Sequence, residues 1–197
     1  RNGDNLVLDN FSLAVRTGET VLLNGRSGIG KSSILKLVLG LRQPDRGTVR
    51  FTGIPVTGHS AWNVRRRAAY VSQDFNLGEG PAIDVFRTVC GYRANQHVKL
   101  TEERLQQLCE QLELPRSLLD KDLELLSGGE KQRVAIILAV ILERDVFLLD
   151  EITSALDKEL KHTVSHFFVG HPEWTILAVS HDPDWSAAPN VRVIELS

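Results

Sequence analysis

The run Gly25-Arg26-Ser27-Gly28-Ile29-Gly30-Lys31-Ser32-Ser33 has the residue types and spacing needed to bind a polyphosphate. It matches the pattern G-x-x-x-x-G-K-[ST], a phosphate-binding loop in which glycines let backbone N–H groups point inward. Lys31 is expected to reach the β- and γ-phosphates, Ser32 to ligate Mg²⁺ and Ser33 to reach the α-phosphate. The alternative is a glycine turn with a surface lysine. The β-rich run before the loop and the helical pattern after it disfavour that alternative.

Two carboxylates follow the apolar run Val146–Leu149. A segment that is apolar on both faces is typical of a central strand in a parallel sheet. Ligands of such sheets bind at the carboxyl ends of the strands. Beside a phosphate-binding loop, Asp150 is therefore expected to hold Mg²⁺ and Glu151 to polarise an attacking water. The simpler interpretation is the polar start of a loop.

A third stretch, Leu126-Ser127-Gly128-Gly129-Glu130-Lys131-Gln132-Arg133, has the spacing of a capping box. Ser127 followed three residues later by Glu130 predicts a helix start, and the apolar run Val134–Leu142 predicts that the helix enters a core. A helix N-terminus with free backbone N–H groups can bind an anion. Taken alone, the stretch remains equally compatible with an ordinary capped helix.

The rest of the chain must position these three stretches. Strand patterns occur at 6–15, 20–23, 48–51, 68–72, 175–180 and 191–196, and helical patterns at 34–41 and 157–168. Between them, residues 74–100 are irregular, and Thr101 is expected to cap a helix that ends by Pro115. Alternating strands and helices predict an α/β domain with a largely parallel sheet, and residues 74–126 a mainly helical insertion.

Composition limits the class of protein. A chain of 197 residues with 42% hydrophobic and 24% charged residues is compatible with one globular domain. The net charge of −2 gives no overall basic surface for nucleic acid, and the apolar run Val134–Leu142 is too short to span a membrane. Cys90 and Cys109 form no CxxC pair, which fits a reducing setting.

With all three stretches present in one order, the chain resembles the ATPase domain of ABC (ATP-binding cassette) proteins over essentially its whole length. The Ser-Gly-Gly-Glu signature shortly before Asp-Glu is specific, because ordinary P-loop enzymes lack it. The resemblance adds a Q-loop glutamine at Gln73, a D-loop at Ser154–Asp157 and a switch histidine at His181.

The resemblance implies an α/β P-loop NTPase fold of the ABC type. Its mostly parallel central sheet would be accompanied by N-terminal antiparallel strands and a helical subdomain. One domain would span residues 1–197, with 1–73 and about 140–197 as the catalytic core. Residues from about 74 to 139, including the signature helix, would form the helical subdomain, which touches the membrane subunits in this family.

The same resemblance implies the substrate ATP with the cofactor Mg²⁺. Glu151 would orient the water, Lys31 and His181 would stabilise the charge of the γ-phosphate, and Gln73 would sense the metal and the nucleotide. The expected metal-site residues are Ser32, Gln73 and Asp150, and the expected nucleotide-binding residues are Gly25–Ser33.

The family works as a head-to-tail dimer, so the signature of one copy would contact the nucleotide of the other. The residues expected in this contact are Ser127, Gly128, Gly129, Gln132 and Asp157. The implied partners are membrane-spanning transporter subunits and a second copy of the ATPase, without nucleic acid. The implied location is the cytoplasmic face of the inner membrane.

Two other functions are possible for such a chain. A soluble ABC ATPase that acts on nucleic acid or ribosomes is disfavoured, because only residues 74–125 separate Gln73 from the signature and no basic face is evident. A non-hydrolysing binding module is disfavoured by the presence of Lys31, Asp150 and Glu151. Transported substrate, transport direction, and identical or different dimer partners stay open.

The chain also departs from the family pattern. No aromatic residue precedes Phe11, so the aromatic side chain that usually stacks on adenine is expected before Arg1. Ile152 stands where proline is common, and this together with the short chain resembles a small bacterial subgroup that exports iron or another metal. His162, His166 and His171 invite a metal site, but a polar helix surface is the favoured interpretation.

Overall fold

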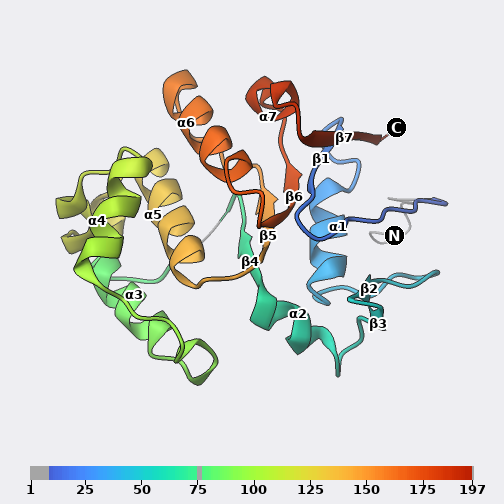
Figure 1. Ribbon diagram of the computed structural model, residues 1–197, viewed down its shortest axis with the longest axis horizontal. Coiled ribbons are helices and arrows are strands. Elements are labelled where there is room, and N and C mark those ends of the chain that lie inside the picture. The colour runs from blue at the N-terminus through green and yellow to red at the C-terminus, as the bar shows by residue number, and fades with distance from the viewer. Residues whose placement is uncertain (1–8, 75–76, 197) are drawn as a thin grey trace.

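A computed structural model describes residues 9–74 and 77–196 of the chain (Figure 1). The strands are β1 (Thr20–Gly25), β2 (Arg50–Phe51), β3 (Ile54–Pro55), β4 (Ala68–Val71), β5 (Val146–Asp150), β6 (Thr175–Val179) and β7 (Val191–Leu196). The helices are α1 (Lys31–Val38), α2 (Ala61–Arg67), α3 (Ala82–Cys90), α4 (Glu102–Gln111), α5 (Gly128–Ile141), α6 (Lys158–Val169) and α7 (Pro183–Ala187). Short 3₁₀ turns lie at Arg93–Asn95, Arg116–Asp120 and Leu123–Leu125.

Five strands form the central sheet in the order β4-β5-β6-β1-β7, and every neighbouring pair is parallel. The predicted α/β fold with a mostly parallel sheet is therefore confirmed. Because all five strands run the same way, their carboxyl ends meet at one edge. The ends of β1, β5 and β6 carry the phosphate-binding loop, Asp150 and the segment before His181, respectively.

The sheet separates two hydrophobic clusters, because alternate side chains of a strand point to opposite faces. On β1, Val21 and Leu23 belong to one cluster and Leu22 to the other. Side chains of α1 and α2 pack in the cluster with Val21, whereas those of α3, α4, α5 and α6 pack in the cluster with Leu22. Helices α1 and α5 therefore lie on opposite faces of the sheet, as Figure 1 also shows.

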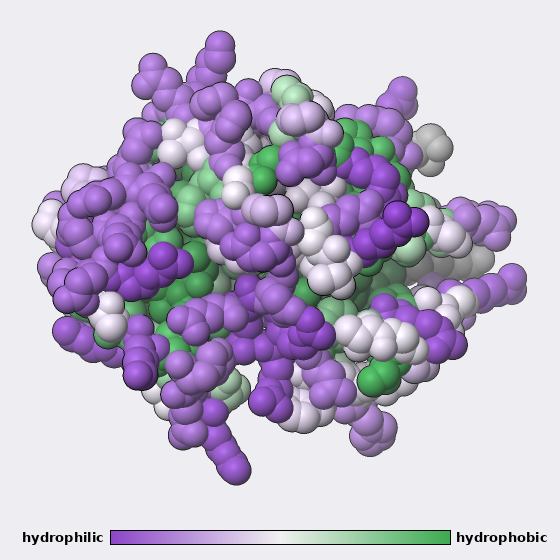
Figure 2. Space-filling model, viewed as in Figure 1, coloured by the Kyte–Doolittle hydropathy of each residue, from purple (hydrophilic) through white to green (hydrophobic). Residues whose placement is uncertain are grey.

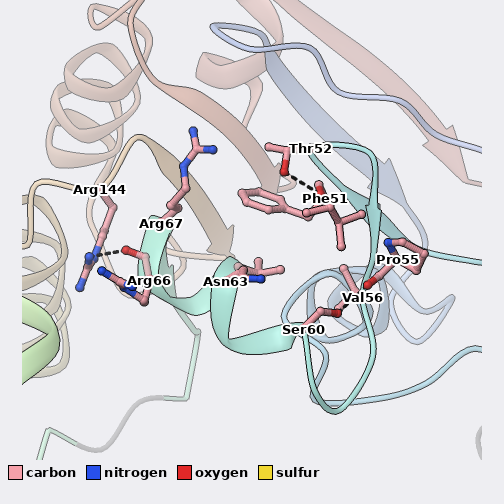
Figure 3. A pocket seen from close by; sticks show the side chains of 11 residues that line it. Phe51, Thr52, Pro55, Val56, Ser60, Asn63, Arg66, Arg67 and Arg144 are labelled. Atoms are coloured by element: carbon pink, nitrogen blue, oxygen red, sulfur yellow. Dashed lines mark hydrogen bonds between the residues drawn. The ribbon is translucent and has the colours of Figure 1, made fainter.

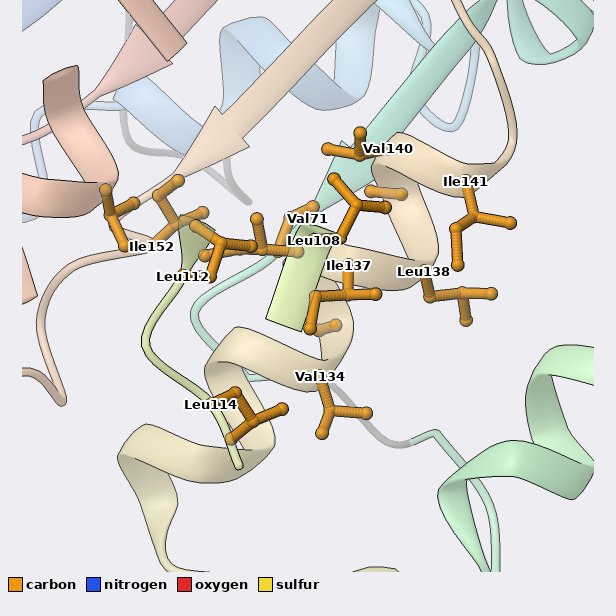
Figure 4. Packing of buried hydrophobic residues seen from close by; sticks show 14 of the residues in the cluster. Val71, Leu108, Leu112, Leu114, Val134, Ile137, Leu138, Val140, Ile141 and Ile152 are labelled. Carbon is orange, nitrogen blue, oxygen red and sulfur yellow. The ribbon is translucent and has the colours of Figure 1, made fainter. Parts of the chain in front are cut away.

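Helix α5 forms the centre of the larger cluster (Figure 4). Every residue of Val134–Ile141 is buried. Figure 4 shows Ile137 and Val140 of this run packed near Leu108. A helix that is apolar on all sides is buried on all sides. The prediction of a capped helix that drives into a core is confirmed.

The prediction of strands at 6–15 is wrong for the part that the structure describes, because residues 9–15 form no strand. Phe11, Leu13 and Val15 alternate toward the smaller cluster, so the pattern reports side-chain packing without a strand ladder. Residues 6–8 lie outside the described residues. Within the described residues, the strands β2 and β3 form an antiparallel pair.

Three helices were not predicted. Residues 74–100, expected to be irregular, contain α3, whose buried side chains Ala82, Ile83 and Phe86 pack in the larger cluster. The glycines and proline before α3 hid it, although Pro81 stands at its N-cap, where proline is tolerated. Helices α2 and α7 are only one to two turns long, which is too short for a clear hydrophobic period.

Most of the surface in Figure 2 is hydrophilic, with hydrophobic residues grouped in a few places. Among the described residues, no helix combines the length and the apolar character that crossing a bilayer requires. Large exposed apolar side chains include Leu41, Ile54 and Trp62.

Candidate nucleotide-binding and hydrolysis site

The phosphate-binding loop connects β1 directly to α1. Strand β1 ends at the first glycine of the loop, Gly25, and α1 begins at its lysine, Lys31. Gly25, Gly28 and Gly30 have φ angles of 143°, 81° and 110°, which L side chains rarely adopt. A Cβ atom at Gly25 would lie 2.7 Å from the Leu196 carbonyl oxygen. The end of β7 therefore presses against the loop, and glycine is required at Gly25 on two grounds.

Lys31 is buried, and its ammonium group lies inside the loop. Its Nζ donates to the carbonyl oxygens of Gly25 at 2.6 Å and Arg26 at 3.1 Å. The same atom lies 3.1 Å from Nε2 of His181, which follows the end of β6. The loop thus holds one fixed positive charge, with an imidazole beside it, at the carboxyl edge of the sheet.

Asp150 is buried at the end of β5, and both of its carboxylate oxygens accept hydrogen bonds. Ser32 Oγ donates to Oδ1 at 2.8 Å, and the Tyr70 hydroxyl donates to Oδ2 at 3.2 Å. Hydroxyl and carboxylate oxygens are the donors that Mg²⁺ prefers, so Ser32 and Asp150 fit the expected metal. Burial, together with the charge and hydrogen bond of Asp150, raises the pKa of Tyr70 to about 12.

Glu151 turns the chain sharply at the end of β5. Its φ is 51°, a left-handed conformation that non-glycine residues seldom adopt and that is common at functional sites. Its backbone N–H donates to the Val179 carbonyl on β6 at 2.9 Å. Its Oε1 lies 3.9 Å from Nε2 of His181. The structure therefore brings Lys31, His181 and Glu151 close together at the carboxyl edge of the sheet.

Gln73 lies in a bend just beyond the end of β4, and its side chain is exposed. In the described part of the chain it makes no hydrogen bond to Ser32 or Asp150. It lies just beyond the carboxyl end of β4, the strand that pairs with β5.

The signature begins α5 with the predicted capping box. Ser127 Oγ accepts from the Glu130 N–H at 3.3 Å, and Glu130 Oε2 accepts from the Ser127 N–H at 2.7 Å. The hydrogen bond from the Ser127 backbone lowers the pKa of Glu130. Ser127 and Gly128 are exposed. They belong to a helix on the face of the sheet opposite α1, so the chain does not place this helix beside the helix of its own phosphate-binding loop.

The other residues expected to contact a second copy's nucleotide are arranged differently. Gly129 packs against the D-loop, and a Cβ atom on it would lie 3.1 Å from the Ala155 carbonyl oxygen. Asp157 caps α6 by accepting from the Leu160 N–H at 2.9 Å. Gln132 is 1% exposed, so its side chain lies inside the protein and is not presented at the surface as that prediction requires. Its burial follows from the position of α5 within the larger cluster.

The three histidines of α6 and its C-terminal end are not brought together. The rings of His162 and His166 are tilted by 44° with centroids 4.0 Å apart, and His162 Nδ1 lies 3.6 Å from an Asp184 carboxylate oxygen. His171 instead stacks on Trp174 with centroids 3.9 Å apart. Within residues 9–74 and 77–196, no group of three or more His, Cys, Asp and Glu side chains is arranged to hold a metal ion.

A groove of about 460 Å³ lies between the β2–β3 pair and α2. Figure 3 shows Arg66, Arg67 and Arg144 on one side of this groove and Phe51 and Pro55 on the other. None of the predicted site residues lines it. Arg67 forms an ion pair with Asp145, and Arg66 lies over the Trp62 ring at 4.8 Å, so the basic run has structural partners.

Tyr70 is the site residue that the sequence interpretation missed. Two features of the sequence pointed to Tyr70. It lies on the strand that leads to Gln73, and residues that pair across neighbouring parallel strands point to the same face of the sheet. Recognising it required the β4–β5 register, in which Tyr70 pairs with Leu148, two residues before Asp150.

Comparison with known proteins gives consistent results. Residues 8–154 match the family model described as ABC transporter. The chain is 36% identical over 187 residues to the "Probable iron export ATP-binding protein FetA" of Escherichia coli K12, covering 92% of this chain and 81% of that protein. It is 37% identical over 164 residues to the "Nickel import ATP-binding protein NikE" of Brucella suis. That match covers 79% of this chain but only 60% of the relative's length.

Solved structures show the same likeness. The dimeric post-hydrolysis state of the ATP-binding cassette MJ0796 with ADP and Pi has a TM-score of 0.83 and 27% identity, covering 97% of this chain and 86% of that one. The structure of cbiO1 from Clostridium perfringens, described as part of the ABC transporter complex cbiONQ, has a TM-score of 0.72 over 89% of this chain and 72% of that one. At 24% identity, the latter supports the fold alone.

Proposed function

The chain belongs to the ABC transporter family as an ATP-binding ATPase subunit, and from this premise we propose how its own residues hydrolyse ATP and drive transport. One observation carries the proposal. The carboxyl ends of β1, β5 and β6 bring a phosphate-binding loop, two carboxylates and an imidazole to one edge of the sheet.

In the proposed reaction, residues Gly25–Ser33 wrap the phosphates of ATP, and Lys31 exchanges its bonds with the Gly25 and Arg26 carbonyls for phosphate oxygens. Ser32 and Asp150 hold Mg²⁺, which neutralises phosphate charge when bound. Phosphoryl transfer of this kind depends mainly on positioning and electrostatics, so each of these fixed groups contributes.

Glu151 is the proposed group that orients the attacking water. Its carboxylate is 26% exposed and lies 3.9 Å from His181, which is also close to Lys31. His181 therefore lies between Glu151, which would hold the attacking water, and Lys31, which would bind the phosphates. Gln73, exposed beyond β4, is proposed to join the site only when Mg²⁺ and nucleotide are bound.

A second copy is proposed to complete the site. Ser127 and Gly128 expose a helix N-terminus, a position that favours anions, and the chain directs this terminus away from the helix of its own loop. The likeness to a dimeric ATP-binding cassette supports a head-to-tail pair in which each signature contacts the nucleotide of the other copy. Membrane-spanning subunits are the proposed partners, reached from the cytoplasmic side of the membrane.

We propose a metal ion, with iron first, as the transported substrate and export as the direction. The likeness to FetA covers most of both chains and supports this assignment, whereas the likeness to NikE covers a smaller share of both. Stimulation of ATP hydrolysis by iron in the complex with the membrane partner would support the assignment. If only nickel stimulates hydrolysis, or if no metal does, the iron-export assignment is overturned and the ATPase proposal stays intact.

The ATPase mechanism is tested by Glu151→Gln, with Glu159→Gln on the exposed first turn of α6 as the matched control. The Glu151 variant is expected to bind ATP with unchanged affinity, to lose turnover by at least about 100-fold, and to accumulate as an ATP-bound dimer. Nucleotide binding, phosphate release and size-exclusion chromatography measure the three effects. Turnover within about twofold of that of the Glu159 variant would remove Glu151 from its proposed role.

A further inference from the structure

The hydroxyl of Tyr70 occupies a position that the family motifs do not assign. Tyr70 lies on β4 and pairs with Leu148 of β5, and Val71 pairs with Leu149. Because side chains alternate along a strand, Tyr70, Leu148 and Asp150 point to the same face of the sheet. Helix α1, which begins at Lys31 and contains Ser32, packs on this face as well.

This placement gives Asp150 two donors from two different elements. Ser32 Oγ of α1 donates to Oδ1 at 2.8 Å, and the Tyr70 hydroxyl of β4 donates to Oδ2 at 3.2 Å. Asp150 is 5% exposed, so water has little access to replace either donor. A buried carboxylate with a donor on each oxygen cannot rotate without breaking a hydrogen bond.

The two donors differ in what else they are expected to bind. Ser32 belongs to the phosphate-binding loop and is itself an expected ligand of Mg²⁺, so its hydroxyl serves the metal through an oxygen lone pair and Asp150 through its proton. Tyr70 is not an expected ligand of the metal. Its hydroxyl has one proton, which it donates to Asp150.

We propose that Tyr70 is a positioning residue for the ATPase reaction, which orients the Asp150 carboxylate toward the metal site through its hydrogen bond to Oδ2. The proposal rests on the proposed role of Asp150 at the Mg²⁺ site. Tyr70 acts through Asp150 and does not touch the nucleotide. It also anchors β4, the strand that leads within three residues to Gln73, to the carboxylate that holds the metal.

The test compares Tyr70→Phe with Tyr92→Phe, which changes the only other tyrosine of the sequence. Tyr92 is 56% exposed and follows α3, and among the described residues its hydroxyl makes no hydrogen bond to a site residue. Each substitution removes one hydroxyl and keeps the ring. Thermal unfolding without nucleotide first establishes that both variants fold like the wild type.

The decisive measurement is nucleotide binding by the 197-residue chain, followed with a fluorescent ATP analogue in EDTA and again in Mg²⁺. The ratio of the two dissociation constants is the gain in affinity that Mg²⁺ provides. Groups that orient a metal ligand typically change metal affinity by about 10- to 100-fold. Tyr70→Phe is expected to reduce the gain about 10-fold and to leave binding in EDTA unchanged, whereas Tyr92→Phe changes neither.

Asp150→Asn separates failure of the inference from failure of the proposed site. If Asp150→Asn abolishes the gain and Tyr70→Phe leaves it within about twofold of wild type, Tyr70 has no positioning role. If Asp150→Asn itself retains the full gain, the proposed metal site is wrong and the inference falls with it. A loss of affinity in EDTA as large as the loss in Mg²⁺ would indicate a general structural effect and would also overturn the inference.

Discussion

Ser127 offers a direct test of whether the signature serves a second copy, because its hydroxyl has two separable functions. The oxygen accepts the Glu130 N–H at 3.3 Å, and the hydroxyl proton stays available for a phosphate oxygen of another chain. Ser127→Ala removes both functions. The capping function affects the stability of each copy, and the donor function affects turnover only when two copies meet.

The two effects have different expected sizes. Loss of an N-cap hydrogen bond costs about 1 kcal/mol of folding stability. Loss of a hydrogen bond to a charged group costs about 1.5–3 kcal/mol, which corresponds to a roughly 10- to 150-fold lower rate if the bond forms in the transition state. The second hydrogen bond of the capping box, from the Ser127 N–H to Glu130, survives in the alanine variant because it uses the backbone.

The chain supplies a matched control in Thr101, the N-cap of α4. Thr101 Oγ1 accepts the Arg104 N–H at 3.3 Å, the same distance as in the Ser127 cap, and Thr101 is exposed. Thr101→Ala should therefore lose a similar amount of stability, about 1 kcal/mol, without a change in turnover. Urea unfolding and steady-state ATP hydrolysis on both variants compare the two effects under conditions where each protein is folded.

The turnover of Ser127→Ala decides between the two functions of this hydroxyl. If Ser127→Ala loses stability like Thr101→Ala but hydrolyses ATP as fast as the wild type, Ser127 is only a cap. Ser127→Thr is the third variant, since it keeps both an acceptor and a donor. Turnover that falls in the alanine variant and recovers in the threonine variant would tie the rate to the hydroxyl.

Two further predictions concern ionisable groups. Burial raises the pKa of Cys109 to about 11 and also raises that of Cys90, so both thiols are expected to react with Ellman's reagent at pH 8 only after unfolding. The Cys109 thiol holds its proton more tightly in the folded state than in the unfolded state. The stability that this thiol contributes is therefore complete below about pH 9 and declines as the pH rises toward 11. Glu130 behaves in the opposite sense: its lowered pKa stabilises the folded state above pH 4.5, and this contribution is lost as the pH falls. Glu130→Gln should therefore lose less thermal stability between pH 6 and pH 3 than the wild type, and an equal loss in both would contradict the prediction.

The sequence predicted most of the fold because its strongest signals are local. The run Val146–Leu149 is apolar on both faces and became β5 at the centre of the sheet, and Ser127 with Glu130 became the predicted capping box. Helix α3 was missed because glycines and a proline precede it, although Ala82, Ile83 and Phe86 already have the spacing of one helix face. The alternation at 11–15 was misinterpreted because burial on one side produces the same period of two with or without a strand partner.

The chemistry of the site was likewise determined by residue type and spacing within single segments. The loop Gly25–Ser33 and the pair Asp150-Glu151 predict phosphate and metal binding without any tertiary information. What the tertiary structure alone decided is which groups meet. His181 lies beside Lys31, Tyr70 bonds to Asp150, Gln132 is buried, and α5 faces away from α1. These contacts join residues up to 150 positions apart, and they depend on the order and register of parallel strands, which no local pattern encodes.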